Sequence, residues 1–217
     1  MKRLVCLVLV VFCLCFSIAL AAPVGERSAE QWYDQGNQYY VSGEYTNAIA
    51  AYTKSIEIDP YTTAYGNRGV AYGKLNQFGR AIEDYTKAIE IDPQNAKAYY
   101  NRGNVYSDFK QFDQAIEDYT KVIELNPQYA EAYYNRGNTY RQLNQIDRAI
   151  LDYTKKIEIN PQDAAAYINR GLAYDELNQK EKAIESYRLF LKYVDPRTMA
   201  KQIEFAKERI LVLSGEK

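Results

Sequence analysis

The sequence contains no histidine, and its three cysteines, Cys6, Cys13 and Cys15, all lie within the first 15 residues. Histidine is the commonest general base and metal ligand, and cysteine supplies thiolate nucleophiles, zinc ligands and disulfides. Without its first segment the chain would carry neither residue type. We therefore expect a protein that is not an enzyme and that needs no metal, cofactor or disulfide framework.

An excess of one charge is also lacking. The chain has 27 basic and 28 acidic residues, and removing Lys2 and Arg3 leaves 25 against 28, a net charge of -3. No basic block or stripe is present, which argues against nucleic acid or an anionic membrane surface as the partner. We expect the partner to be a protein or peptide, and we expect no small-molecule substrate.

One long apolar run stands at the start of the chain. Met1, Lys2 and Arg3 precede apolar residues from Leu4 to Leu20, and small alanines follow. This layout predicts a secretory signal peptide over residues 1–21, followed by a polar linker over residues 22–28. The alternative is an uncleaved membrane anchor, since the run approaches the length of a bilayer span. Either way the rest of the chain is expected outside, in the periplasm or secreted.

From residue 29 onward the chain repeats itself with a period of 34 residues. The clearest marks are four glycines and three prolines at that spacing: Gly69, Gly103, Gly137 and Gly171, then Pro93, Pro127 and Pro161. Such self-similarity is typical of a helical repeat array. It predicts five repeats over residues 29–61, 62–95, 96–129, 130–163 and 164–197, the first being one residue short.

Each repeat has the spacing of two helices. In the 96–129 repeat, residues four and three apart form one face of a first helix and a matching stripe on a second: Tyr99, Gly103 and Tyr106, then Ala115, Tyr119 and Val122. Pro127 ends the second helix because proline lacks an amide hydrogen. A single pair cannot bury its apolar face alone, so the pairs are expected to stack around one elongated core.

The pattern resembles the tetratricopeptide repeat (TPR) family. Counting from the first residue of each repeat, five positions match it: an aromatic at four (Trp32, Tyr65, Tyr99, Tyr133, Tyr167), glycine at eight (Gly36, Gly69, Gly103, Gly137, Gly171), tyrosine at eleven (Tyr39, Tyr72, Tyr106, Tyr140, Tyr174), alanine at twenty (Ala48, Ala81, Ala115, Ala149, Ala183) and tyrosine at twenty-four (Tyr52, Tyr85, Tyr119, Tyr153, Tyr187). The resemblance implies an all-α superhelix of helix-turn-helix repeats with a concave groove.

Residues 198–217 depart from the repeat and predict a capping helix. Five apolar residues recur at spacings of four and three and form one stripe: Met199, Ile203, Ala206, Ile210 and Leu213. Charged residues such as Lys201 and Glu208 occupy the other face. A helix with one apolar face is suited to covering the last repeat of a solenoid.

Two features depart from the family pattern. Position seven carries arginine in four repeats (Arg68, Arg102, Arg136, Arg170), and aspartate recurs in three of the second helices (Asp84, Asp118, Asp152). We expect a structural ion-pair ladder, formed either within each repeat or with the preceding one. Lys156 stands where the other repeats carry Ser55, Ala88, Val122 and Phe190, and its amine is expected to extend to solvent.

The resemblance implies that the side of each first helix opposite positions four, eight and eleven lines the groove. Two rows of polar residues lie there, position six (Asp34, Asn67, Asn101, Asn135, Asn169) and position nine (Asn37, Asn104, Asn138, interrupted by Val70 and Leu172). An asparagine amide both donates and accepts, so these rows could bind the main chain of an extended peptide. Alternatively they are copies of a structurally good repeat.

Neighbouring groove positions would supply specificity. Position five offers Tyr33, Tyr100 and Tyr134, with Gly66 and Ile168 in the other repeats, and the basic residues Lys74, Lys97 and Arg141 lie toward the middle. Tyrosine brings a large contact area at low entropic cost, and the central cations favour a ligand with acidic groups. The carboxylate clamp of family cochaperones is not expected, since Tyr33 and Asn101 stand where two of its three cations belong.

The sequence thus predicts a non-enzymatic scaffold that binds an extended peptide or partner segment in the groove. The alternative is a structural assembly factor of an envelope or secretion complex, which would dock through the convex face or the capping helix.

Overall fold

The computed structural model describes residues 27–215, so the predicted signal peptide or anchor lies outside the described residues. Within this range the chain forms eleven α-helices and no strand: α1 (Ala29–Val41), α2 (Tyr45–Ile58), α3 (Thr62–Lys74), α4 (Phe78–Ile91), α5 (Ala96–Asp108), α6 (Phe112–Leu125), α7 (Ala130–Gln142), α8 (Ile146–Ile159), α9 (Ala164–Glu176), α10 (Lys180–Tyr193) and α11 (Ala200–Ser214). None of these helices is long and apolar enough to cross a membrane.

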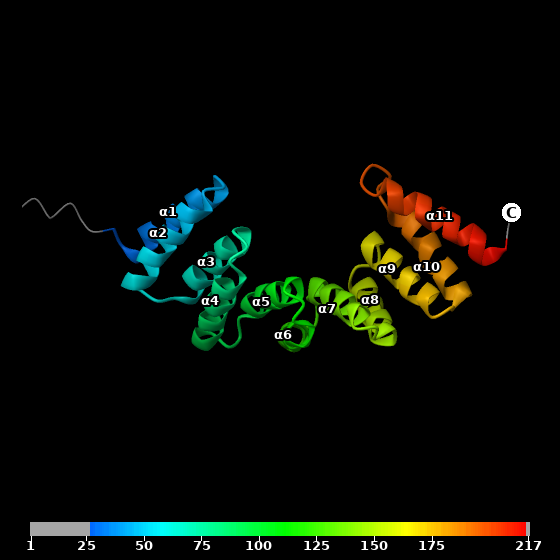
Figure 1. Cartoon of the computed structure of the whole chain (residues 1–217), viewed down its shortest axis with the longest axis horizontal. Helices are drawn as coiled ribbons and strands as arrows, with labels where there is room; N and C mark the ends of the chain where they lie inside the picture. Colours follow the sequence, from blue (N-terminus) through cyan, green and yellow to red (C-terminus); the bar gives the residue numbers. More distant parts are fainter. Residues whose placement is uncertain (1–26, 216–217) are drawn as a thin grey trace, which may run out of the picture.

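The helices pack in consecutive pairs that stack into an arc (Figure 1). Within the arc, α3, α5, α7 and α9 lie on the inner side, while α6 and α10 lie outside. The first helices of the first four repeats also contact one another in sequence, α1 with α3, α3 with α5 and α5 with α7. The predicted all-α solenoid with a C-terminal cap is confirmed, and its concave side is built from the first helix of each repeat.

The tight turn between the two helices of a repeat depends on one left-handed residue at position fifteen. Its φ angle is positive in every repeat: Gly43 (78°), Asn76 (56°), Lys110 (59°), Asn144 (57°) and Asn178 (55°). Glycine and asparagine adopt this conformation most readily. A residue suited to the left-handed conformation therefore recurs at this turn in four of the five repeats, and Lys110 is the exception.

Close packing of the two helices depends on a glycine facing a buried tyrosine. In the third repeat a Cβ added to Gly103 would lie 2.9 Å from Cε1 of Tyr119 and 3.3 Å from Cβ of Asp118. Tyr119 is almost fully buried, so its ring cannot move aside freely. Gly103 therefore allows α5 to approach α6 closely.

We expect Gly103→Ala to lower the free energy of unfolding by about 1–2 kcal/mol, because overpacking outweighs the higher helix propensity of alanine. Gly73→Ala is the matched control, since a Cβ there would meet no atom within 4 Å. That variant should be as stable as the parent or up to about 1 kcal/mol more stable. Urea denaturation followed by circular dichroism measures both, and equal stabilities would contradict the packing role of Gly103.

The predicted ion-pair ladder is confirmed: in the second, third and fourth repeats the arginine pairs with the aspartate of its own repeat. Arg102 donates from Nε and Nη2 to the two carboxylate oxygens of Asp118, both at 2.8 Å, and from Nη1 to Oγ1 of Thr86 in the preceding repeat at 2.9 Å. The same arrangement recurs twice, as Arg68 with Asp84 and Thr53, and as Arg136 with Asp152 and Thr120. In the fifth repeat Arg170 donates instead to Oγ of Ser186 at 3.2 Å.

These pairs are removed from water to a considerable degree. Burial raises the pKa of the Asp118 carboxyl above its usual value, and the hydrogen bonds from Arg102 oppose that rise. Burial is the largest effect on Arg102 and acts against its charged form, but the hydrogen bonds to Asp118 and the charge attraction to Asp118 together outweigh it, so the arginine pKa lies above its ordinary value. Each pair is therefore stable when complete and costly when one partner is removed.

The expectation for Lys156 is wrong. Its side chain does not extend to solvent, because the residue is only 3% exposed. Its amine lies 3.0 Å from Oε2 of Glu131, 3.2 Å from Oδ2 of Asp163 and 4.1 Å from the centre of the Tyr134 ring. Two carboxylates and a ring face compensate the buried charge, an arrangement of neighbours that the repeat pattern does not reveal.

The predicted packing of the capping helix is confirmed. Ala206 is buried in a cluster with residues of the fifth repeat, and the rest of the stripe packs against that cluster. Three large apolar side chains of α11 nevertheless remain exposed, Phe205 (38%), Leu211 (48%) and Val212 (60%). The stripe pattern did not predict that these three side chains are exposed.

Candidate partner-binding groove

Hydrogen bonds connect most of the two asparagine rows into a lattice that crosses the repeat boundaries. In the third and fourth repeats, Nδ2 of Asn135 donates to the Tyr100 hydroxyl at 3.0 Å and to Oδ1 of Asn104 at 2.9 Å. Two further boundaries carry the same pair of bonds, from Asn67 to Tyr33 and Asn37 and from Asn169 to Tyr134 and Asn138, all between 2.9 and 3.1 Å. We call this arrangement the asparagine lattice.

The tyrosines at position twenty-four join the second helices to the asparagine lattice. The hydroxyls of Tyr52, Tyr119 and Tyr153 each donate at 2.8 Å to Oδ1 of the position-nine asparagine in the same repeat. The rows therefore contribute to the packing of the repeats, a role that the sequence alone does not show. Each amide still keeps one polar group that the lattice does not use, Oδ1 at position six and Nδ2 at position nine.

The asparagine lattice is interrupted at the boundary between the second and third repeats. Gly66 and Val70 occupy positions five and nine of the second repeat, so the two acceptors for the next asparagine are absent. Within residues 27–215, neither the Asn101 amide nor the Tyr85 hydroxyl has a hydrogen-bond partner. Asn101 is thus the predicted groove asparagine whose amide is not engaged in the fold.

Two hollows follow one another along the concave side. The first, of about 440 Å³, brings together four predicted site residues, Asn37, Asn67, Lys97 and Asn101. Tyr40, Val41, Tyr52 and Val70 complete its wall, and Val41 is 85% exposed. The second, of about 320 Å³, is lined by the predicted residues Asn104, Asn135 and Asn138 together with Ser107, Asp108 and Tyr119.

Val41 and Val70 escaped the sequence prediction because it looked only for polar and aromatic contacts. Val41 stands at position thirteen of its repeat and Val70 at position nine, both on the groove side of the first helix, and this placement was the signal that could have found them.

The charged residues on the groove side divide into those that form ion pairs and those that do not. Arg141 forms an ion pair with Glu176 of the next repeat, and Asp175 binds Arg209 of α11 at 2.7 Å. Lys74, Lys97 and Asp34 are exposed and form no ion pair with any residue in the described range. Among the predicted groove residues, the unpaired positive charges therefore lie in the second and third repeats, and Lys97 lines the first hollow.

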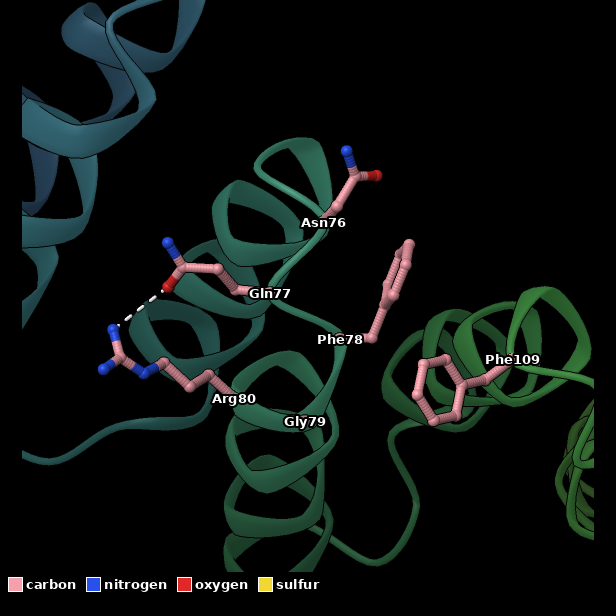
Figure 2. Close-up of a pocket in the computed structure, with 6 residues that line it drawn as sticks. All are labelled: Asn76, Gln77, Phe78, Gly79, Arg80 and Phe109. Carbon is pink, nitrogen blue, oxygen red and sulfur yellow. Dashed lines mark hydrogen bonds between the residues drawn. The ribbon is translucent and has the colours of Figure 1, made fainter.

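A further hollow, of about 490 Å³, lies at the turn edge of the solenoid (Figure 2). Phe78 at the start of α4 and Phe109 at the end of α5 face it, with ring centres 5.9 Å apart, and Arg80 donates to Gln77 beside it at 3.0 Å. No predicted site residue lines it. The exposed ring of Phe109 covers the junction of two repeats there.

Comparison with known protein families agrees with this architecture. Models described as "Tetratricopeptide repeat" match residues 29–61, 96–129, 130–163 and 153–185, and one described as "TPR repeat" matches residues 69–108. The chain belongs to the tetratricopeptide repeat family. It is a repeat scaffold for protein interactions, and the described residues contain no group of three acidic, histidine or cysteine side chains that could hold a metal ion.

Solved structures of other TPR proteins superpose closely on this TPR chain. MamA has 30% sequence identity and a TM-score of 0.72, with 80% of this chain and 94% of MamA covered. YrrB, described as a TPR protein with an unusual peptide-binding site, has 25% identity and a TM-score of 0.70, with 83% and 92% covered. MamA from Desulfovibrio magneticus RS-1 shares the fold at 19% identity and a TM-score of 0.71, with 76% and 94% covered.

Proposed function

We propose that this TPR protein binds an extended segment of a partner protein in its concave groove. The observation that carries the proposal is the pair of consecutive hollows lined by asparagines whose remaining amide groups the asparagine lattice does not use. Such groups suit a peptide main chain, which presents donors and acceptors regardless of its side chains. The asparagine lattice fixes these amides in position before binding, which reduces the entropic cost of association.

The charges favour an acidic segment over a basic one. Lys97 lines the first hollow and Lys74 is exposed at the end of α3, and neither has an ion-pair partner among residues 27–215. An acidic segment would place its charge beside these amines, while the exposed Asp34 of the first repeat would repel it. We propose that the protein performs this role after export, as the apolar segment over residues 1–21 indicates.

A second candidate is docking through the cap. Phe205, Leu211 and Val212 expose apolar surface on one helix at the end of the array. Exposed apolar patches of this kind occur at protein interfaces. In that case the protein would act as an assembly factor, and the groove would stay empty.

Site-specific photo-crosslinking in cells distinguishes the two proposals. A photoreactive amino acid is placed at Lys74 or Lys97 for the groove, at the exposed Lys87 of the outer helix α4, and at Val212 of the cap. We expect the two groove sites to capture one common partner, with Lys87 and Val212 giving none. Capture from Val212 alone would overturn the groove proposal and support the assembly role.

A further inference from the structure

The interruption of the asparagine lattice leaves open space where other repeats place a tyrosine ring. A Cβ added to Gly66 would meet no atom within 4 Å. At the same position, Tyr33, Tyr100 and Tyr134 hold their rings 5.9, 6.1 and 6.0 Å from the tyrosine of the second helix. The corresponding tyrosine of the second repeat, Tyr85, therefore lacks a ring neighbour that three other repeats provide.

Two polar groups border this space without their usual partners. In three other repeats the hydroxyl of the position-five tyrosine accepts a hydrogen bond at 2.9–3.0 Å from the asparagine of the next repeat. Asn101 has no such acceptor, and the Tyr85 hydroxyl has no asparagine oxygen to bind, because Val70 replaces it. A tyrosine hydroxyl is protonated and can donate at neutral pH, and burial raises the pKa of Tyr85 further above its usual value.

The fifth repeat shows how this chain completes the same arrangement elsewhere. Ile168 and Leu172 replace the tyrosine and the asparagine there, and both pack in the cluster that α11 covers. Phe205 of α11 brings its ring to 6.0 Å from Tyr187, the position-twenty-four tyrosine. An element outside the repeats thus supplies the missing aromatic ring. At Gly66 no described residue does so.

The geometry points to a pocket at Gly66 that receives a tyrosine side chain of the bound segment. The incoming ring lies beside Tyr85, as the repeat's own tyrosines do, and its hydroxyl accepts a hydrogen bond from Nδ2 of Asn101. Val70 and Asn101 also line the first hollow, so the pocket borders the surface that the segment follows. This inference rests on the proposed groove function, and it adds a preference for a bound segment that carries a tyrosine.

The test uses nine-residue peptides of serine and alanine with tyrosine, phenylalanine, leucine or alanine at the centre. Binding to the isotope-labelled protein is followed by NMR, with the side-chain amide signal of Asn101 as the reporter. We expect the tyrosine peptide to bind about 10-fold more tightly than the alanine peptide and about 3-fold more tightly than the phenylalanine peptide.

Gly66→Tyr combined with Val70→Asn restores the asparagine lattice and fills the pocket. This variant should fold normally and bind the tyrosine peptide at least about 10-fold more weakly. Gly66→Ala is the matched control, because its methyl group meets no atom and leaves the pocket open, so its affinity should stay within about 2-fold of the parent.

Three results would overturn the pocket: equal binding of all four peptides, unchanged binding by the filled variant, or no binding of any peptide. The groove function is judged separately, because crosslinking from Lys97 does not depend on tyrosine.

Discussion

Asp118→Ala is expected to lower the free energy of unfolding by about 3 kcal/mol, because it leaves Arg102 in a mostly buried site without its carboxylate. The side chains of Arg102 and Asp118 are only 16% and 6% exposed, so water cannot replace the lost partner fully. Arg102 also holds Thr86 of the preceding repeat, so its displacement affects two repeats. Urea denaturation followed by circular dichroism measures the change.

Two further variants separate burial from charge. Glu117→Ala removes the same charge from the adjacent exposed residue, and its stability should stay within about 0.5 kcal/mol of the parent. Arg102→Met combined with Asp118→Leu removes both charges and should recover most of the loss. If the double variant is as unstable as Asp118→Ala, the ion pair itself stabilises the fold, and the loss in Asp118→Ala is not due only to the unpaired charge of Arg102.

Truncation before Thr198 is expected to destabilise the protein by about 3–6 kcal/mol and to cause aggregation. Four partly buried apolar side chains would be lost, Met199 before α11 and Ile203, Ile210 and Leu213 within it, each at about half of the roughly 1.5–3 kcal/mol that complete burial contributes. The loss would expose Tyr187 and Phe190, which are both 0% exposed in the capped solenoid. Size-exclusion chromatography and thermal denaturation measure the result.

A substitution on the outer face of the cap provides the control. Leu211→Asp changes a side chain that is 48% exposed and should leave stability within about 0.5 kcal/mol. A truncated protein that remains monomeric and equally heat-stable would contradict the capping role. Lost partner capture with Leu211→Asp, at unchanged stability, would support docking through the cap.

Periodicity was sufficient to predict the helices and their packing. The spacing of Tyr99, Gly103 and Tyr106 reports one helix face, and Pro127 marks an end, because both effects act within a few residues. The pairing of Arg102 was recognisable as chemistry but not as geometry. Arg102 binds Asp118 of its own repeat and Thr86 of the preceding repeat, and each lies 16 residues away along the chain. The repeat period alone therefore does not show in which repeat the carboxylate partner lies.

The candidate site was less accessible to sequence reasoning. The sequence shows the asparagines as two rows but not the tyrosine hydroxyls that bind them. Those hydroxyls come from position five of the first helix, as in Tyr100, and from position twenty-four of the second helix, as in Tyr119. Lys156 was misjudged because its neutralising partners, Glu131 and Asp163, are exceptions to the repeat pattern. A residue that differs from its equivalents in the other repeats makes contacts of its own, and those contacts can be found only from its neighbours in space.

The interruption of the asparagine lattice also has a mechanical consequence. The resistance of a stacked repeat array to bending depends, at each repeat boundary, on the bonds that cross it. The boundary between the second and third repeats lacks the asparagine–asparagine hydrogen bond that the other three boundaries have. Bending under load should therefore concentrate there. A guest side chain that bridged Tyr85 and Asn101 would stiffen that boundary, so ligand binding and the curvature of the array would be coupled.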